Sequence, residues 1–369
     1  MSTGGASPRG GSADLEAFLD QQIEAGYFPG AVAVVGDAEG VLARAARGHA
    51  VLEPERRAVQ ADTLFDLGSL TQPLVTAPLA LLLHVVEGFD LELQVRKFLP
   101  ELDRLDKREL TVRDLLLHRA GLPAWAPLYA HGLERSRFLR ALGDQPLVYA
   151  PRSRVLPSDI GYFLLGEVVA RVGSAPLDLL ARELLFEPLG ATGLGFGPYL
   201  GERRLCTAAT ERGDAGERER AGKTAPGYNG WRQEMIWGEV HDHNCWVLGG
   251  VSGHAGLFGS APELCRYGLE FLGRGRGLFP ERLLALLRME ETAGCASGRT
   301  LCWRLARSAG NGLPPTAIGH DATTGASVWI DPALGRLTIL LGNCLHPHRR
   351  ACDMDALRRD YHRLACALS

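Results

Sequence analysis

Ser69 is followed three positions later by Gln72, within the stretch TLFDLGSLTQPLVT at 63–76. The apolar run that follows predicts a helix, so Ser69 is expected near its first turn, where free backbone N–H groups stabilise an anion. A serine hydroxyl there attacks an acyl carbon once a neighbouring base removes its proton. Residues i and i+3 share a helix face, but the amide of Gln72 does not titrate in water. The stretch therefore predicts a nucleophile without its neighbouring proton acceptor.

Further polar motifs follow this stretch along the chain. They are LLLHRAGLP at 115–123, SDIGYFLLG at 158–166, GEVHDHN at 238–244, GHAGLF at 253–258 and IGHDATTGASVWIDP at 318–332. With the stretch around Ser69, these strings resemble the motifs of the serine β-lactamase and penicillin-binding-protein-like hydrolases, in particular the branch of class C β-lactamases, D,D-peptidases and esterases. The resemblance covers nearly the whole chain. It implies acyl-enzyme chemistry on a small-molecule ester, amide or cell-wall-like ligand.

Two positions depart from the family motifs where a base is expected. Gln72 stands where the resembled family has the lysine of S-x-x-K, and Pro157 stands where it has the tyrosine that opens Y-x-N or Y-S-D. Asp159 closes this second motif, and proline has no titratable group. Tyr149 and Tyr162 lie nearby in sequence, but neither matches the motif position. The resemblance thus implies that both usual proton acceptors are absent.

The string IGHDATTGASVWIDP at 318–332 stands where the resembled family has a strand that faces the serine. His320 stands where the family places a lysine or histidine, and a neutral imidazole accepts protons near pH 7; the alternative is a strand histidine bonded to a loop carbonyl. By position, the backbone N–H groups of Ser69 and Thr323 match the family's oxyanion hole. Ala322 replaces a glycine, and its methyl is expected to obstruct substrate. Asp321 would repel anionic ligands if it faced the cleft.

Three hypotheses follow from these residues. In the first, the chain is a hydrolase homologue with impaired catalysis and a retained ligand-binding cleft, because Gln72, Pro157 and Ala322 depart at three motifs. In the second, it is an active serine hydrolase with His320 or water as the base for Ser69. In the third, activity depends on a metal held by two clusters whose spacings match no recognised zinc site. These clusters are His241, His243 and Cys245, and Cys344, His346, His348 and Cys352.

A folding role is expected for both clusters and for His254, so no metal or other cofactor is expected.

The chain has 369 residues and 46% hydrophobic composition, enough for a substantial core. Forty basic and 43 acidic residues, without a basic stripe, argue against nucleic acid. No apolar run reaches the roughly 18 residues of a membrane span, so the apolar stretch 73–86 is interpreted as a buried helix. The oligomeric state stays open.

The N-terminal stretch 1–13 lacks the layout of a secretory signal. A cytoplasmic location is therefore expected, with all eight cysteines as free thiols.

The elements that must position these residues indicate an α/β (α+β) fold, an antiparallel sheet flanked by helices with a mainly helical region inserted. Helices are predicted over 15–25, 73–87, 111–118, 160–172, 177–187, 261–272 and 353–368, and strands within 28–50, 300–306, 318–325, 326–332 and 337–343. Residues 1–13 are expected to be disordered and 14–369 to form one β-lactamase-related domain. Its sheet would come from about 26–66 and 298–345 and its helical region from about 69–290, with 211–230 a mobile loop near a cleft.

Overall fold

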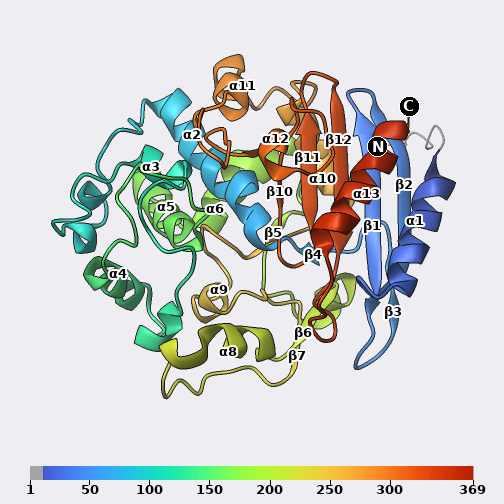
Figure 1. Cartoon of the computed structure of the whole chain (residues 1–369), viewed down its shortest axis with the longest axis horizontal. Coiled ribbons are helices and arrows are strands. Elements are labelled where there is room, and N and C mark those ends of the chain that lie inside the picture. Colours follow the sequence, from blue (N-terminus) through green and yellow to red (C-terminus); the bar gives the residue numbers. More distant parts are fainter. Residues whose placement is uncertain (1–10, 369) are drawn as a thin grey trace.

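The computed structural model describes residues 11–368, which form three antiparallel sheets and the helices around them (Figure 1). The main sheet has seven strands in the order β3-β2-β1-β12-β11-β10-β9. They are β1 (Gly30–Asp37), β2 (Gly40–Val51), β3 (Arg57–Ala58), β9 (Arg304–Leu305), β10 (Ile318–Asp321), β11 (Ser327–Asp331) and β12 (Arg336–Gly342). Since β1 pairs with β12, the sheet joins the two ends of the chain. The expected antiparallel sheet is confirmed.

Two smaller sheets lie in the segment between. One has the order β4-β8-β5 and the other pairs β6 with β7. Their strands are β4 (Phe65–Asp66), β5 (Gly195–Phe196), β6 (Ala209–Arg212), β7 (Met235–Trp237) and β8 (Leu257–Gly259). The helices are α1 (Ser12–Glu24), α2 (Ala77–Glu87), α3 (Val112–Leu116), α4 (Arg135–Asp144), α5 (Asp159–Val172), α6 (Leu177–Ala181), α7 (Glu187–Leu189), α8 (Ala215–Ala221), α9 (His243–Val247), α10 (Ala261–Phe271), α11 (Glu281–Arg288), α12 (Ala306–Ala309) and α13 (Met354–Ala367). Most of them lie between β4 and β9, as predicted for the helical region.

The alternation of side chains along β1 divides the core in two. Ala31, Ala33 and Val35 pack with the apolar faces of α1 and α13, which cover one face of the sheet (Figure 1). Val32 and Val34 point to the other face and join the larger core, which includes α2, α5 and α10. Because successive strand residues point to opposite faces, one buried strand serves both layers.

The predicted helix 73–87 has an irregular start. A 3₁₀ turn, Gly68–Leu70, and a π-helical segment, Gln72–Thr76, precede α2. Pro78 lacks an N–H and its ring would crowd the Leu74 carbonyl of a regular helix. The Leu74 carbonyl instead accepts the Tyr267 hydroxyl at 2.5 Å. Pro78 therefore accounts for the difference from the predicted uniform helix.

The whole stretch Gly68–Glu87 is, within the described chain, one helical segment long and apolar enough to cross a membrane by length and composition. Of its most apolar window, 78% is buried inside the protein. This burial confirms the interpretation of 73–86 as a buried helix.

Other predicted elements differ in extent. The segment 211–230 was expected to be a loop, but it contains α8, a 3₁₀ turn and the end of β6; its place beside the cleft is confirmed, because Glu211 and Glu217 line the cavity beside Ser69. The strand predicted over 300–306 shortens to β9, since the Thr300 hydroxyl accepts N–H bonds from Cys302 and Trp303 and makes a turn. Of the stretch predicted to be disordered, 1–10 lie outside the described residues and Ser12 begins α1.

Candidate active site

Ser69 lies at the centre of the 3₁₀ turn that leads into the buried helix. Gly68 has a φ of +51°, a left-handed conformation that glycine adopts without a Cβ clash. The Asp66 carboxylate accepts the Gly68 N–H at 2.9 Å, and the Thr71 hydroxyl donates to the Gly68 carbonyl at 2.7 Å. These bonds fix the backbone on both sides of Gly68, so the position of Ser69 follows from its neighbours.

His320, on β10, is the residue that reaches the serine. Its Nε2 lies 3.0 Å from Ser69 Oγ. Burial lowers the pKa of His320 to about 3, and the positive charge of Arg299 acts in the same direction. The imidazole is therefore neutral near pH 7, and Nε2 is free to accept the serine proton if the other ring nitrogen holds the hydrogen. The structure confirms the predicted position of His320 and does not support the alternative bond to a loop carbonyl.

Gln72 is bonded away from the serine. Its Nε2 donates to Asp159 Oδ1 at 3.0 Å. Burial raises the pKa of Asp159, because a carboxylate loses hydration there and the amide offers a hydrogen bond but no charge. An uncharged amide and a carboxyl group are therefore bonded to each other where the family motifs would place a lysine.

No tyrosine substitutes for Pro157 in the described part of the chain. The Tyr149 hydroxyl donates to the His118 carbonyl at 3.2 Å, and the Tyr162 hydroxyl donates to the Leu116 carbonyl at 3.2 Å. Both phenols thus have structural partners. Next to Pro157, the Ser158 side chain caps α5 by accepting the Gly161 N–H, so the motif retains its folding role.

Asp321 does not face the cleft. Its carboxylate accepts bonds from the Ser327 hydroxyl at 2.7 Å and Trp329 Nε1 at 3.0 Å, and it lies 3.5 Å from the Arg358 guanidinium. Although burial opposes ionisation, these groups hold the pKa of Asp321 below its usual range. The condition for the predicted repulsion of anions is not met, because neighbouring residues of a strand point to opposite faces and His320 takes the side that faces Ser69.

Ala322 and Thr323 end the same strand. The Ala322 side chain is 1% exposed and packs near Gly68, outside the set of cavity-lining residues. The expected obstruction of substrate by this methyl is therefore wrong. Thr323 lines the cavity together with Ser69. An oxyanion hole formed by their two backbone N–H groups stays a prediction.

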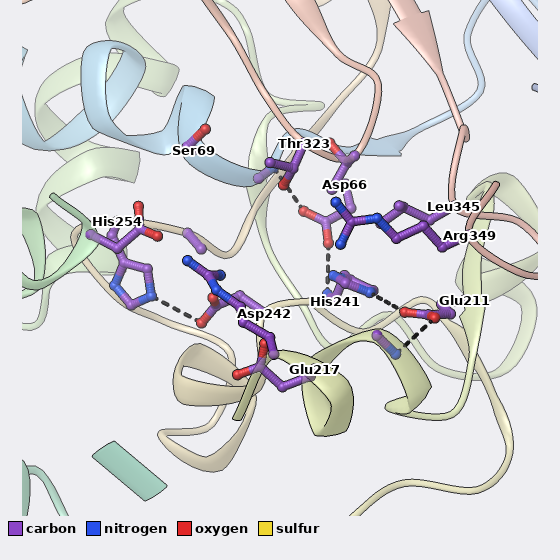
Figure 2. A pocket seen from close by; sticks show the side chains of 16 residues that line it. Asp66, Ser69, Glu211, Glu217, His241, Asp242, His254, Thr323, Leu345 and Arg349 are labelled. Atoms are coloured by element: carbon purple, nitrogen blue, oxygen red, sulfur yellow. Dashed lines mark hydrogen bonds and ion pairs between the residues drawn. The ribbon is translucent and has the colours of Figure 1, made fainter. Parts of the chain in front are cut away.

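The cavity beside Ser69 has a volume of about 470 Å³ (Figure 2). It is lined by Asp66, Gly68, Ser69, Asp159, Glu211, Gly216, Glu217, Arg220, His241, Asp242, His254, Ala255, Thr323, Thr324, Leu345 and Arg349. Of the predicted site residues, Ser69, Asp159 and Thr323 line it directly. Gln72 and His320 are not among the lining residues, but each is bonded to one of them, Gln72 to Asp159 and His320 to Ser69. The structure thus brings all five predicted residues together.

The histidines of the cavity are paired with carboxylates. His254 Nε2 lies 2.9 Å from Asp242 Oδ1, and His241 Nε2 lies 2.9 Å from Glu211 Oε2. Although burial opposes it, the charge of Asp242 raises the pKa of His254. His254 also contacts the Ser252 hydroxyl at 2.8 Å, in keeping with the folding role predicted for it.

The two clusters considered for metal binding have other partners. In the first, His243 lies 3.0 Å from Asp214 and the Cys245 thiol donates to the Ala255 carbonyl. In the second, His346 Nε2 accepts the Leu52 N–H at 2.7 Å and the Cys344 thiol donates to the Thr323 carbonyl. Across residues 11–368, no group of three or more His, Cys, Asp or Glu side chains is arranged to hold a metal ion. The metal-dependent hypothesis therefore has no site in the described structure.

Sequence reasoning missed much of the charged lining. Glu211, Glu217 and Arg220 belong to a polar segment that was interpreted as a loop, and Arg349 follows a predicted turn. One of the charged lining residues could have been predicted from the sequence. Asp66 follows two apolar residues and stands three positions before Ser69. The other side chains converge only through the tertiary fold.

A sheet built from both chain ends, a helical insertion and a serine at a helix start together define the β-lactamase/transpeptidase-like fold. The model of the Beta-lactamase family matches residues 15–363. The chain belongs to this family. The match and the relatives below support a β-lactamase-family serine hydrolase or D,D-peptidase-like function.

Relatives and solved structures are similar over most of the chain. The "Putative D-alanyl-D-alanine carboxypeptidase" of Salmonella gallinarum is 30% identical over 90% of this chain and 82% of its own length; that of Salmonella schwarzengrund is 31% identical with the same coverage. A class C β-lactamase mutant has a TM-score of 0.74 at 17% identity, covering 97% of each chain. The D-alanine carboxypeptidase AmpC from Burkholderia cenocepacia has a TM-score of 0.70 at 18% identity, covering 96% of this chain and 99% of its own. At such identities, the structural matches show the fold.

Proposed function

We propose that this protein is a β-lactamase-family serine hydrolase with impaired turnover, which binds a small ester, amide or cell-wall-like ligand and is acylated at Ser69. The observation that carries the proposal is the contact of 3.0 Å between Ser69 Oγ and His320 Nε2. In the described residues, His320 is the titrating side chain found in hydrogen-bond contact with that hydroxyl. Ser69 therefore has one proton acceptor, and it is a weak one.

The weakness has a physical cause. A general base works best when its pKa lies near the operating pH, and a positioned base contributes about 10²–10⁴-fold in rate. Burial and Arg299 lower the pKa of His320 to about 3, so its affinity for the serine proton is reduced. Gln72 is bonded to Asp159 and supplies no second base. Proton transfer in both acylation and deacylation is consequently slow.

Covalent labelling tests the proposal directly. Purified protein is incubated with a fluorophosphonate or a penicillin, and the mass of the intact chain is followed over time. We expect slow, stoichiometric addition of one label that is lost in Ser69→Ala and kept in Ser153→Ala, a serine outside the cavity. Labelling that persists in Ser69→Ala, or its absence from the unmodified protein, would overturn the assignment of Ser69 as nucleophile.

An efficient hydrolase is the second candidate, favoured by the same Ser69–His320 contact. The two candidates differ in turnover rather than in labelling. Steady-state hydrolysis of a p-nitrophenyl ester at or above about 1 per second, within the range of ordinary enzymes, would establish the efficient enzyme. A single burst followed by slow release of product supports the impaired one.

We also propose a cytoplasmic location. All eight cysteines are unpaired in the structure, which suits a reducing compartment. Fractionation of cells that express the full chain tests this location, and recovery outside the cytoplasm would refute it.

A further inference from the structure

Glu217 is a buried carboxylate in the wall of the cavity without a complete set of partners. The residue is 9% exposed, and its buried Oε1 atom makes no hydrogen bond; the Tyr129 hydroxyl, which likewise makes none, lies close enough to lower the pKa of the carboxyl. An acceptor left unpaired in the interior costs free energy, and a charged acceptor costs more than a neutral one. Figure 2 shows Glu217 and Ser69 on opposite sides of the cavity. A ligand that spans the cavity from Ser69 therefore ends near an unpaired acceptor.

The other carboxylates of the lining already have partners. Asp66 accepts the N–H groups of Gly68 and His241. Glu211 accepts the Gly216 N–H at 3.1 Å and contacts His241. Asp242 is bonded to His254 and to the Cys245 N–H. Asp159 accepts the Gln72 amide at 3.0 Å. Glu217 thus differs from these carboxylates in having a buried oxygen that makes no hydrogen bond.

The positive groups of the lining occupy more exposed positions. Arg220 and Arg349 are both exposed, and the Arg220 guanidinium lies over the Trp125 ring at 4.3 Å from its centroid. Exposed charges are screened by water and salt, whereas buried charges interact through a lower dielectric. The buried part of the wall contains Asp66, Glu211 and Glu217, and its buried histidine, His254, is already paired with Asp242. When Glu217 is ionised, its charge is therefore only partly offset by the two exposed arginines.

We propose that the cavity selects acyl ligands that carry a free amino group, with the ammonium bound at Glu217 while the acyl carbon lies at Ser69. An ammonium group supplies the two things that the Glu217 oxygen lacks, which are a hydrogen-bond donor and a positive charge. A carboxylate at the same end of the ligand would be repelled by Glu217 and Asp242. This inference rests on the proposed function only for the acyl end of the ligand; the amine end depends on Glu217 alone.

Three matched esters test the selectivity. They are p-nitrophenyl esters of hexanoic acid, 6-aminohexanoic acid and adipic acid, whose acyl chains end in a methyl, an ammonium and a carboxylate. The second-order rate constant of Ser69 acylation is measured for each by release of p-nitrophenolate. We expect the ammonium ester to acylate about tenfold faster than the methyl ester, as for a hydrogen bond to a charged group, and the carboxylate ester to be slowest.

Glu217→Gln keeps the shape of the side chain and removes its charge. We expect this variant to lose the tenfold ratio between the ammonium and methyl esters. Glu219→Gln is the matched control, because Glu219 lies on the same helix, is exposed and does not line this cavity; its ratio should equal that of the unmodified protein. An unchanged ratio in Glu217→Gln, or a preference for the carboxylate ester, would overturn the inference.

Binding without chemistry separates this inference from the proposed function. Calorimetry with Ser69→Ala measures the affinities of 6-aminohexanamide and hexanamide, which do not require a nucleophile. Tighter binding of the amine, abolished by adding Glu217→Gln, supports the amine site even if no ester acylates Ser69. Acylation of Ser69 with equal affinity for the two amides would instead uphold the hydrolase and refute the amine site.

Discussion

Ser69 Oγ and His320 Nε2 lie 3.0 Å apart although 251 positions separate the two residues in the chain. The contact exists because the last strands return to the sheet that the first strands began, and β10 ends beside the turn that holds Ser69. The helical insertion between them provides the remaining wall of the cavity. A serine at a helix start and an imidazole on a strand are thereby in contact at the place where the family motifs imply two other bases.

Replacing His320 should remove the remaining proton acceptor. For His320→Gln we expect acylation of Ser69 to slow by about 10²-fold or more, the lower end of what a positioned base contributes. The rate is read from intact-mass labelling with a fluorophosphonate. His348→Gln is the control, because His348 is exposed and outside the cavity. Equal labelling rates in His320→Gln and the unmodified protein would show that water or another group accepts the proton.

The pH dependence of acylation should be flat where an ordinary histidine would titrate. The pKa of His320 is lowered from 6.5 to about 3, so the imidazole is neutral throughout pH 5 to 8 and the base is fully available. Rates measured with the neutral hexanoate ester are expected to vary less than about twofold over this range. A tenfold decline towards pH 5 with a midpoint near 6.5 would mean that burial does not lower the pKa.

The lowered pKa of His320 should also make the protein less stable in acid. The unfolded chain binds a proton at His320 near pH 6.5, and the native protein does so only near pH 3. The unfolded state therefore binds more protons as pH falls from 6.5 towards 3, and the free energy of unfolding should decline in that window. Burial likewise lowers the pKa of His118 and His362, which adds to the effect. Urea unfolding at pH 7.5 and 5 measures it; equal stabilities would contradict it.

Restoring ester hydrolysis should require Asp159→Asn in addition to the two family residues, Gln72→Lys and Pro157→Tyr. In Gln72→Lys, the new ammonium would meet the Asp159 carboxylate that now accepts the Gln72 amide at 3.0 Å. An ion pair keeps a lysine protonated and unable to act as a base. We therefore expect Gln72→Lys with Pro157→Tyr to raise ester hydrolysis modestly, and the addition of Asp159→Asn to raise it by about 10²-fold. Asp159→Asn alone is the control. No gain in the triple variant would show that the pocket cannot use these bases.

Local sequence patterns predicted the parts of the site that belong to motifs. Ser69 was predicted from a helix start together with the resemblance to the family's first motif, and His320 from the resemblance of its strand to the family's third motif. The orientation of Asp321 was predictable as well, because residues 320 and 321 of one strand must face opposite sides. The alternation of side chains along a strand was the available signal, since it turns Asp321 away from Ser69 once His320 is placed towards Ser69.

Other features depend on contacts that no local pattern contains. The bond from Gln72 to Asp159 joins residues 87 positions apart. Glu217 lies in a charged segment whose composition is typical of a loop, yet α8 forms there and lines the cavity. Its ends are held by tertiary bonds, such as that between Arg232 and Asp214. Tertiary contacts of this kind override the local preference.

Asp114 should be far more important for stability than exposed ion-pair residues. Its fully buried carboxylate accepts bonds from Arg119 and Arg152 at 2.8 Å and, as part of a capping box with Thr111, the Thr111 N–H at 3.1 Å. Asp114→Ala should cost about 3 kcal/mol, since it leaves two guanidinium groups and a helix start without their partner. Asp144→Ala, which removes an exposed pair with Arg104, should cost under about 1 kcal/mol. Similar urea midpoints for the two variants would refute this ranking.

The affinity of the cavity for an amine should increase with pH. Burial raises the pKa of Glu217 to about 7, with a further increase from Asp242 that Arg220, His241 and the Tyr129 hydroxyl oppose. A carboxyl with this pKa is about one-tenth ionised at pH 6 and nine-tenths ionised at pH 8, while an alkyl ammonium remains protonated at both. Binding of 6-aminohexanamide to Ser69→Ala should therefore tighten by about tenfold between pH 6 and 8. Hexanamide serves as the uncharged reference at each pH, so that changes elsewhere in the cavity cancel. Because Glu217→Gln has no carboxyl to ionise, its profile should be flat, and a slope that survives in this variant would assign the titration to another group.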